Sequence, residues 1–277
     1  MDSIPKFPLG EMIEKFIDFT TEHFSGFTRA VSDITETALE HLIDGMLFFH
    51  PVVFIAVVCG LLFRFSGRRI AIGSAAGLLF ILNLGLWDAT ISTLALVLSA
   101  TFVSVLAGVP LGIAAALYSP FKRVLMPLLD FMQTMPAFVY LIPAIPFFGL
   151  GPVSAIFTTV VFAMPPAIRL TCLGISQVPA ELIEAADAFG STKKQKLFKL
   201  QLPLAMPTIM AGVNQTIMLA LSMVVIASMI GAGGLGGEVW RAIQRLWMGR
   251  GFEAGIAVVI IAMILDRVTQ NTAAKKR

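Results

Sequence analysis

Long apolar runs constrain the fold of this chain more than any other feature of its sequence. They fall near residues 46–63, 70–87, 90–117, 128–150, 152–173, 204–230 and 254–268. Eighteen helical residues rise about 27 Å, close to the roughly 30 Å hydrocarbon core of a bilayer. Only 13% of the 277 residues are charged, about half the usual share in soluble domains, so lipid must cover much of the surface. The sequence therefore predicts an all-α polytopic membrane protein with about seven transmembrane helices.

The last run is the shortest, because its clearly apolar part covers only 15 residues, 254–268. It predicts either a span that also uses Phe252 and Glu253, or a re-entrant or buried helix.

The distribution of Lys and Arg predicts the orientation of these spans. With seven spans, 14 of the 20 basic residues fall on one side, including those at 64–69, 193–199 and 275–277. The positive-inside rule makes this side cytoplasmic. The N-terminus is then outside, and the tail at 271–277 is cytoplasmic. Arg241, Arg245 and Arg250 on the outer side are the exception to this bias.

Residues 1–45 differ from the rest because apolar and charged residues alternate at helical spacing. The apolar positions on either side of Gly26 are Leu9, Met12, Ile13, Phe16, Ile17, Phe27, Val31, Ile34, Ala38 and Leu42. This pattern predicts two amphipathic helices that lie at the outer, extracytoplasmic interface or pack on the spanning bundle. A soluble helical hairpin is the alternative.

Neutral polar side chains and prolines within the spans suggest a passage for a solute. The candidate pathway residues are Gln133, Thr134, Pro136, Thr158, Asn214 and Gln215. Prolines interrupt helices and are tolerated at membrane depth beside protein or a water-lined cavity, so broken helices around a cavity are expected. The alternative is that the polar groups only form hydrogen bonds between helices. Asp130 and Arg169 lie toward span ends, which argues against an ion-driven carrier.

A glycine-rich run follows the sixth apolar run. Gly231, Gly233 and Gly236 match the GxGxxG spacing of a dinucleotide loop, but they follow a long apolar span instead of a strand. We therefore interpret this run as a close-packed turn or gate, because glycine lets backbones approach and flex. The candidate gate residues are Gly231, Gly233, Gly234 and Gly236.

The sequence predicts neither a metal site nor a catalytic site. His23, His41 and His50 lack ligand spacing with cysteine or carboxylate residues. Cys59 and Cys172 lie in apolar runs, where small buried thiols are expected. The net charge is only +3, which does not favour nucleic-acid binding. We expect a chain that is not an enzyme and carries no cofactor of its own.

One segment on the predicted cytoplasmic side, residues 174–203, is long, charged and helix-prone. Pro179 can occupy a first helical turn, and Glu181 then lies where the helix dipole favours negative charge. Gly190 can stop this helix, and Ser191 can cap a second helix that returns to the membrane. A hairpin of this kind is suited to docking in the groove of a partner.

The spacing within this segment resembles the EAA motif of the permease subunits of bacterial ABC importers. The matching residues are Glu184, Ala185, Ala186, Gly190 and the run Leu200-Gln201-Leu202-Pro203. The stretches FMQTMPAFVYLIPAIPFFGLG from Phe131 and IGAGGLG from Ile230 resemble the branch that imports glycine betaine, proline betaine, choline and related compatible solutes. The resemblance covers about residues 85–268.

This resemblance implies a type I importer permease of the MetI-like fold in a bacterial inner membrane, with a core at 88–270 preceded by two spans at 46–87. It implies an ATP-driven complex with a second permease copy, two cytoplasmic ATPase subunits and an extracytoplasmic solute-binding protein. The implied ATPase-coupling residues are Glu184, Ala185, Ala186, Gly190, Leu202 and Pro203. No GxxxxGK[ST] sequence occurs in the chain, so ATP and Mg²⁺ are expected on the partner ATPase.

Other functions stay open at this point. Another small amine or amino acid, such as histidine or carnitine, would fit the same kind of permease. An ion-coupled secondary carrier would transport without an ATPase and should show inverted halves. A membrane scaffold would carry no solute, and an intramembrane enzyme would need clustered catalytic groups.

Overall fold

The computed structural model describes residues 8–274, and in these residues the chain forms helices and the turns between them. In chain order the helices are α1 (Leu9–Leu47), α2 (Pro51–Ser66), α3 (Arg68–Asn83), α4 (Trp87–Leu117), α5 (Ser119–Thr134), η1 (Ala137–Tyr140), α6 (Leu141–Phe148), α7 (Pro152–Ser176), α8 (Ala180–Ala188), α9 (Lys193–Lys196), η2 (Leu197–Gln201), α10 (Leu202–Ala227), η3 (Ser228–Ile230), α11 (Gly234–Gln244) and α12 (Met248–Ala274).

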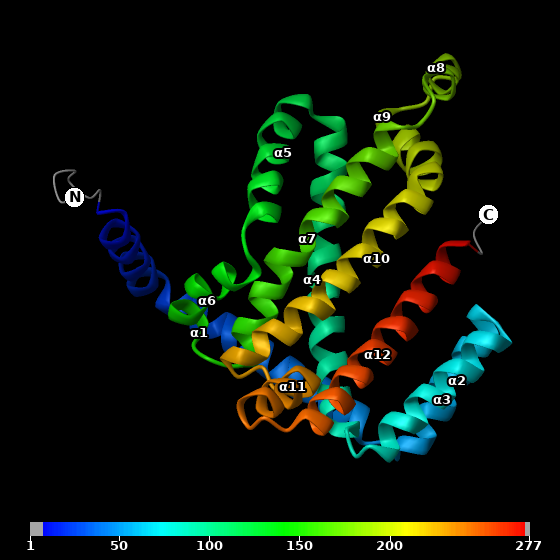
Figure 1. Ribbon diagram of the computed structural model, residues 1–277. Helices are drawn as coiled ribbons and strands as arrows, with labels where there is room; N and C mark the ends of the chain where they lie inside the picture. Colours follow the sequence, from blue (N-terminus) through cyan, green and yellow to red (C-terminus); the bar gives the residue numbers. More distant parts are fainter. Residues whose placement is uncertain (1–7, 275–277) are drawn as a thin grey trace, which may run out of the picture.

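Three long helices, α4, α7 and α10, form the centre of the molecule (Figure 1). They approach closely because glycines lie where they cross. A Cβ on Gly112 of α4 would lie 2.6 Å from the Ile168 carbonyl oxygen of α7. A Cβ on Gly212 of α10 would lie 3.1 Å from the Pro166 carbonyl oxygen of α7. Small residues at such contacts promote helix association in lipid, where no hydrophobic drive exists between helices.

By length and composition, four helices can cross a membrane: α4, α7, the continuous helix Lys193–Ile230 and Met248–Gln270 of α12. Two bent pairs raise this number to six, because α1 meets α2 at 94° and α5 meets the η1–α6 segment at 110°. The described residues thus hold four to six candidate spans, where about seven were expected. The runs at 46–63 and 70–87 become α2 and α3, which have 16 residues each and form a hairpin around Gly67.

The expected span at 128–150 is interrupted, because α5 ends at Thr134. Met135 has an extended backbone, with φ −69° and ψ 134°, since the ring of Pro136 disfavours a helical residue before it. The Tyr140 hydroxyl donates a hydrogen bond to the Met132 carbonyl oxygen. This bond satisfies one of the acceptors that the end of α5 leaves without a helical partner.

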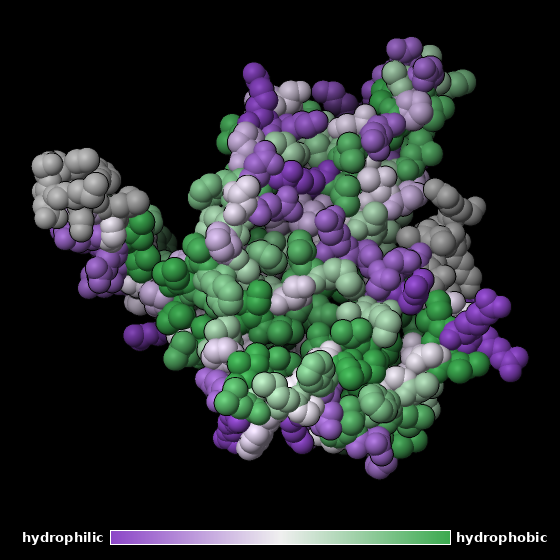
Figure 2. Space-filling model, viewed as in Figure 1, coloured by the Kyte–Doolittle hydropathy of each residue, from purple (hydrophilic) through white to green (hydrophobic). Residues whose placement is uncertain are grey.

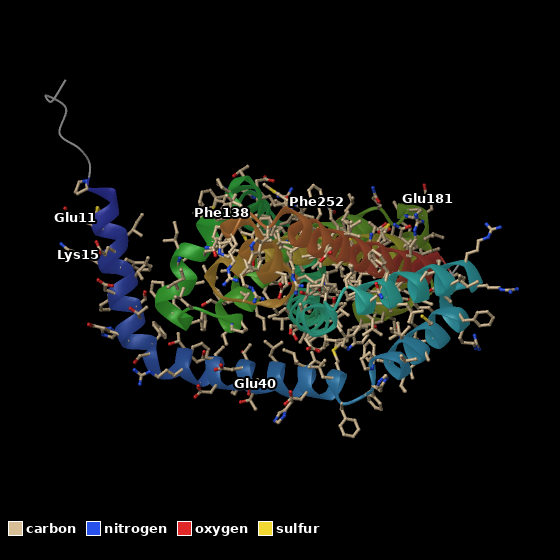
Figure 3. All side chains as sticks on the ribbon, turned by 60° about the horizontal axis from the view of Figure 1, so that its bottom comes forward. Glu11, Lys15, Glu40, Phe138, Glu181 and Phe252 are labelled. Carbon is tan, nitrogen blue, oxygen red and sulfur yellow. The ribbon has the colours of Figure 1, made fainter. Side chains whose placement is uncertain are left out.

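α1 is a single helix of 39 residues, where two helices were expected. Gly26 lies inside it, because one glycine costs a helix only about 1 kcal/mol relative to alanine. Figure 3 shows that α1 bends between Lys15 and Glu40 and runs along the outside of the bundle. Most of its side chains are exposed, and those that are buried include Thr28 and Leu39.

The C-terminal region departs from expectation in two ways. α12 has 27 residues, so the short apolar run at 254–268 belongs to a helix long enough to span. The preceding loop contains α11, an 11-residue helix that was not predicted. Leu235 and Ala242 are the buried apolar side chains of this helix.

Candidate functional site

The segment with the motif match forms a helical hairpin that projects from one end of the molecule (Figure 1). Its first arm is α8, which ends in a Schellman motif. The Ser191 N–H donates to the Ala186 carbonyl oxygen at 3.0 Å, and the Gly190 N–H donates to the Asp187 carbonyl oxygen at 2.9 Å. Gly190 has a φ of 74°, a left-handed conformation that glycine adopts without a steric penalty. The predicted stop at Gly190 is therefore confirmed.

The side chains of α8 are available to a partner, since none of them is buried. Glu184 and Ala185 are exposed, and Ala186 is half-buried. Phe189, directly after α8, is 90% exposed, the highest value among the large hydrophobic side chains described. Phe189 was not singled out from the sequence, although an aromatic residue beside a glycine stop in a charged loop was an available signal. The ring of Phe189 is therefore open to contact with a partner at the tip of the hairpin.

The second arm begins with α9, whose N-cap is Thr192 and not Ser191 as expected. Thr192 Oγ1 accepts from the Gln195 N–H at 3.3 Å, and Gln195 Oε1 accepts from the Thr192 N–H at 2.8 Å. These two bonds form a capping box. Ser191 is instead the last residue of the Schellman motif. Lys196 Nζ lies 2.6 Å from Asp187 Oδ1, so an ion pair joins the two arms.

An apolar cluster anchors the hairpin on the bundle. Leu197 of η2 packs with Ile175 of α7 and Ile209 of α10, and all three are buried. η2 is a π-helical turn in which the Leu202 N–H donates to the Leu197 carbonyl oxygen. The wider turn accommodates Pro203, which has no N–H for the usual bond four residues back. α9 consequently continues into α10 as one helix, Lys193–Ile230.

The glycine-rich run after α10 is a tightly packed turn. Three of its glycines have left-handed backbones: Gly231 (φ 95°), Gly233 (φ 75°) and Gly234 (φ 66°). A Cβ on Gly234 would meet Thr93 Oγ1 at 2.5 Å, and a Cβ on Gly236 would meet Val225 Cα at 2.8 Å. Thr93 Oγ1 also accepts from the Leu235 N–H at 2.8 Å. The close-packed turn is confirmed, and its use as a gate stays a prediction.

The candidate pathway residues occupy different surroundings. The hydroxyl of buried Thr158 donates to the Ser154 carbonyl oxygen of its own helix at 2.8 Å. Asn214 joins α10 to α12, because its Nδ2 donates to Asp266 Oδ1 at 2.9 Å and its Oδ1 accepts from the Thr269 hydroxyl. The exposed candidates are Gln133, Thr134, Pro136 and Gln215. Asn214 therefore makes the interhelical bonds that were the alternative, and Thr158 bonds within its own helix. A role in the pathway stays a prediction for all six residues.

Two carboxylates link the spans. Arg169 Nη2 donates to Asp130 Oδ1 at 2.6 Å and joins α7 to α5. Asp266, which was not singled out from the sequence, accepts from Asn214 and also from Gln270 Nε2 at 2.7 Å. Both carboxylates therefore have the partners that ionisable groups require within spans.

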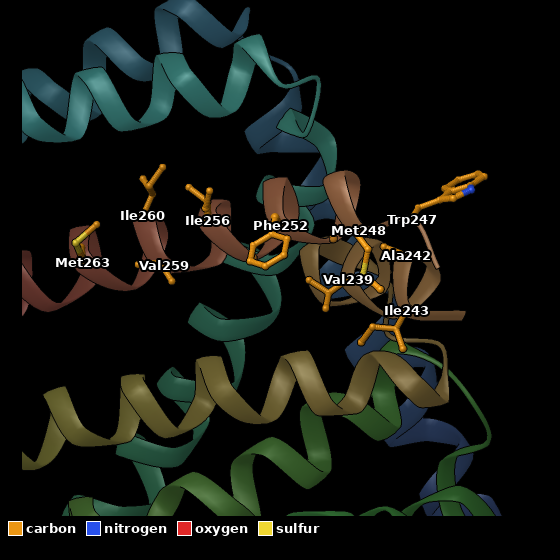
Figure 4. Close-up of a pocket in the computed structure, with 12 residues that line it drawn as sticks. Val239, Ala242, Ile243, Trp247, Met248, Phe252, Ile256, Val259, Ile260 and Met263 are labelled. Carbon is orange, nitrogen blue, oxygen red and sulfur yellow. The ribbon is translucent and has the colours of Figure 1, made fainter. Parts of the chain in front are cut away.

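A groove of about 600 Å³ lies between α11 and α12 (Figure 4). Its lining residues are apolar and include Ile243, Trp247, Phe252 and Met263. A charged solute needs polar or charged partners placed around it, and none of the lining residues carries a charge. The apolar lining of this groove is instead typical of a helix surface that lipid covers. Among residues 8–274, no group of three or more His, Cys, Asp or Glu could hold a metal ion.

Comparison with known proteins identifies the class to which this fold and hairpin belong. A family model described as "Binding-protein-dependent transport system inner membrane component" matches residues 108–277. The glycine betaine transport system permease protein OpuAB of Bacillus subtilis is 50% identical over 277 residues, which cover 100% of this chain and 98% of that protein. The glycine betaine/carnitine transport permease protein GbuB of Listeria monocytogenes is 49% identical over 278 residues, covering 98% of this chain and 97% of that protein.

A third relative is the glycine betaine/proline betaine transport system permease protein ProW of Escherichia coli. It is 47% identical over 267 residues, which cover 95% of this chain and 74% of that protein. Among solved structures, a chain of the MetNI methionine ABC transporter in an inward-facing conformation has a TM-score of 0.63 at 22% identity, covering 69% of this chain and 96% of that chain. This likeness shows the MetI-like permease fold.

The fold and the family match define a permease of the ABC importer class. The chain belongs to the family of binding-protein-dependent transport system inner membrane components. It is a multi-pass protein of the inner membrane whose family implies a binding protein and an ATPase as partners. The resemblance found from the EAA spacing is confirmed, and ATP hydrolysis belongs to a separate subunit.

Proposed function

We propose that the chain is the membrane-spanning subunit of an ATP-driven importer for glycine betaine or a related compatible solute, such as proline betaine, choline or carnitine. The exposed α8 hairpin, closed by Gly190 and tipped by Phe189, is the observation that carries the coupling proposal. The solute class is supported by end-to-end similarity to permeases whose names include glycine betaine.

In the proposed complex, two copies of the chain each offer α8 to one of two cytoplasmic ATPase subunits. The small side chains of Ala185 and Ala186 let the backbone of α8 approach closely to a groove on the ATPase. Phe189 supplies the aromatic anchor typical of contact hot spots. Glu184 is exposed and provides a polar contact at the rim. Leu202 and Pro203 begin the span that receives the movement.

In this proposal the hairpin moves as one stiff unit and transmits the movement of the ATPase to α10. The Asp187–Lys196 ion pair joins its arms, and Leu197 fixes its base on α7 and α10. ATP prefers the closed ATPase pair, and this differential affinity shifts the permease toward its outward-open state. Hydrolysis then removes the preference and resets the inward-open state. ATP and Mg²⁺ stay on the ATPase, and this chain needs no cofactor.

The α8 end of the bundle is cytoplasmic in this proposal. The glycine turn and α11 lie at the opposite end (Figure 1), where the solute-binding protein would deliver its cargo. Gly231, Gly233, Gly234 and Gly236 then form an outer gate, while α1 lies along the outer interface. The exposed pathway candidates are Gln133, Thr134, Pro136 and Gln215; Thr158 and Asn214 are the less exposed ones.

Reconstituted transport tests this proposal. The chain is placed in proteoliposomes with its ATPase and binding protein, and uptake of labelled glycine betaine is measured. We expect uptake that requires ATP and both partners. Excess unlabelled proline betaine, choline or carnitine should reduce it, and excess histidine should not.

Two outcomes would overturn separate parts of the proposal. Uptake by the chain alone under an ion gradient would make it a secondary carrier. ATP-dependent uptake of histidine without uptake of any betaine would leave the coupling intact and reject the solute class.

A further inference from the structure

A second groove, of about 410 Å³, lies between α3 and α12. Its walls combine apolar residues with two arginines, Arg69 of α3 and Arg267 of α12, and Ser74 supplies the only hydroxyl in the lining. The α11–α12 groove described above has no charged lining residue. The mixed lining distinguishes this second groove from an ordinary lipid-facing surface.

The two helices are antiparallel here, so both arginines lie at the same end of the groove. The opposite end is closed, because a Cβ on Gly77 would lie 2.6 Å from Ile260 Cγ2. Four residues toward Arg69, a Cβ on Gly73 would meet nothing within 4 Å, so the helices have separated. The slot from the closed end to the arginines is about 12 Å long at a rise of about 1.5 Å per residue.

The open end concentrates positive charge. α3 starts with Arg68 and Arg69, its N-cap Gly67 makes no side-chain cap hydrogen bond, and no acidic residue lies in its first turn. Within residues 8–274, neither Arg68 nor Arg69 has an ion-pair partner. Basic side chains at a helix N-terminus oppose the helix dipole. A bound anion would relieve this repulsion and accept hydrogen bonds from the free N–H groups.

We propose that the α3–α12 groove binds one anionic phospholipid, with its phosphate between Arg69 and Arg267 and the start of an acyl chain in the slot. Ile70, Met263 and Ile264 supply the apolar walls. A free phosphate would use the arginines but would leave these walls unfilled. The charge at the mouth and the apolar slot behind it together select an anionic lipid. This site lies outside the coupling hairpin and does not depend on the identity of the solute.

Lipid retention by the purified full-length chain tests the site. The chain is incubated in neutral detergent with labelled phosphatidylglycerol or with phosphatidylcholine of the same acyl chains. The lipid retained per chain after gel filtration is then measured. We expect at least a fivefold preference for phosphatidylglycerol, which excess inorganic phosphate does not abolish. The double substitution Arg69→Gln with Arg267→Gln should bring the preference close to one.

Two matched variants separate the parts of the site. Lys122→Gln with Arg123→Gln removes the same charge from α5 and should keep the preference. Gly73→Leu keeps both arginines but fills the slot, and it should lower retention of phosphatidylglycerol several-fold. Monodisperse elution of each variant verifies its fold.

Three results would overturn the proposal. Phosphatidylglycerol retention could be unchanged in the double arginine variant, or it could be lost equally in the α5 control. Displacement of the lipid by inorganic phosphate would show a simple anion site instead.

Discussion

At the scale of single residues, the hairpin tip combines one residue that shapes it with one that can bind. Gly190 lets the chain reverse after α8 because its φ of 74° carries no steric penalty for glycine. Phe189 holds its ring in solvent at 90% exposure, so it contributes little to the stability of the isolated chain. Stability and docking should therefore respond differently to changes at this tip.

Truncation of Phe189 should weaken the ATPase contact without unfolding the permease. For Phe189→Ala we expect an unchanged Tm of the isolated chain. The affinity for the ATPase should fall about tenfold or more, since aromatic anchors at contact centres are worth at least about 1.4 kcal/mol. Titration of the detergent-solubilised chain with the ATPase measures this. Phe102→Ala, which truncates a ring of α4 that is 67% exposed, is the control and should bind normally. Equal affinities for the two variants would contradict α8 docking.

At the scale of helices, the sequence predicted those features that depend only on residues close together in the chain. The runs behind α4, α7, α10 and α12 were found because an apolar stretch of spanning length is a strong signal. The break after α5 depends on Pro136, which the sequence marks, but no local pattern predicts the 110° angle of the bend there. α11 was missed because its three glycines, Glu238 and Arg241 interrupt a short apolar face. Gly26 suggested a helix end that its small energetic cost does not impose.

Site residues divide in the same way. The turn at Gly190 was predictable because its φ requirement is local. The bond between Asn214 and Asp266 was not, because it joins residues 52 positions apart. No spacing rule connects such a pair before the helices have packed.

Loss of the Asp266 carboxylate should loosen α12 from α10. Asp266→Ala leaves the half-buried Asn214 amide without its acceptor, which should cost toward the lower end of the about 1–3 kcal/mol of a buried unsatisfied donor. We expect a lower Tm in detergent, measured by thermal unfolding. Gln215→Ala, a change at the exposed neighbour of Asn214, should have little effect. The double variant Asn214→Ala with Asp266→Ala should lose less than the sum of the two single changes, and strict additivity would argue against the bond.

At the scale of the whole molecule, the hairpin and the glycine turn occupy opposite ends of the bundle (Figure 1). The arginines at the turn between α2 and α3 belong to the more basic set of loops, together with the lysines of α9. In Figure 2, hydrophilic residues gather at the upper end and along the lower rim of the visible face and extend from the upper end into its middle, while hydrophobic residues dominate the broad region above the lower rim. This distribution agrees with a molecule that crosses a bilayer, with α8 on the side where positive charge accumulates.

Cysteine labelling tests the proposed orientation. In a chain with Cys59→Ser and Cys172→Ala, single cysteines are introduced by Glu40→Cys in α1 and Glu181→Cys in α8. In intact bacterial spheroplasts, a membrane-impermeant maleimide should label only the Glu40→Cys chain. The Glu181→Cys chain should react only after permeabilisation. The reverse result would place the N-terminus in the cytoplasm.

The exposed side chain of Phe189 also has a consequence for how cells assemble such a complex. A copy made without its ATPase keeps this exposed aromatic side chain in the aqueous compartment. Chaperones and quality-control proteases recognise exposed apolar groups of this kind. Permease copies without an ATPase should therefore be degraded quickly, and the abundance of the permease should follow the rate at which the ATPase is synthesised.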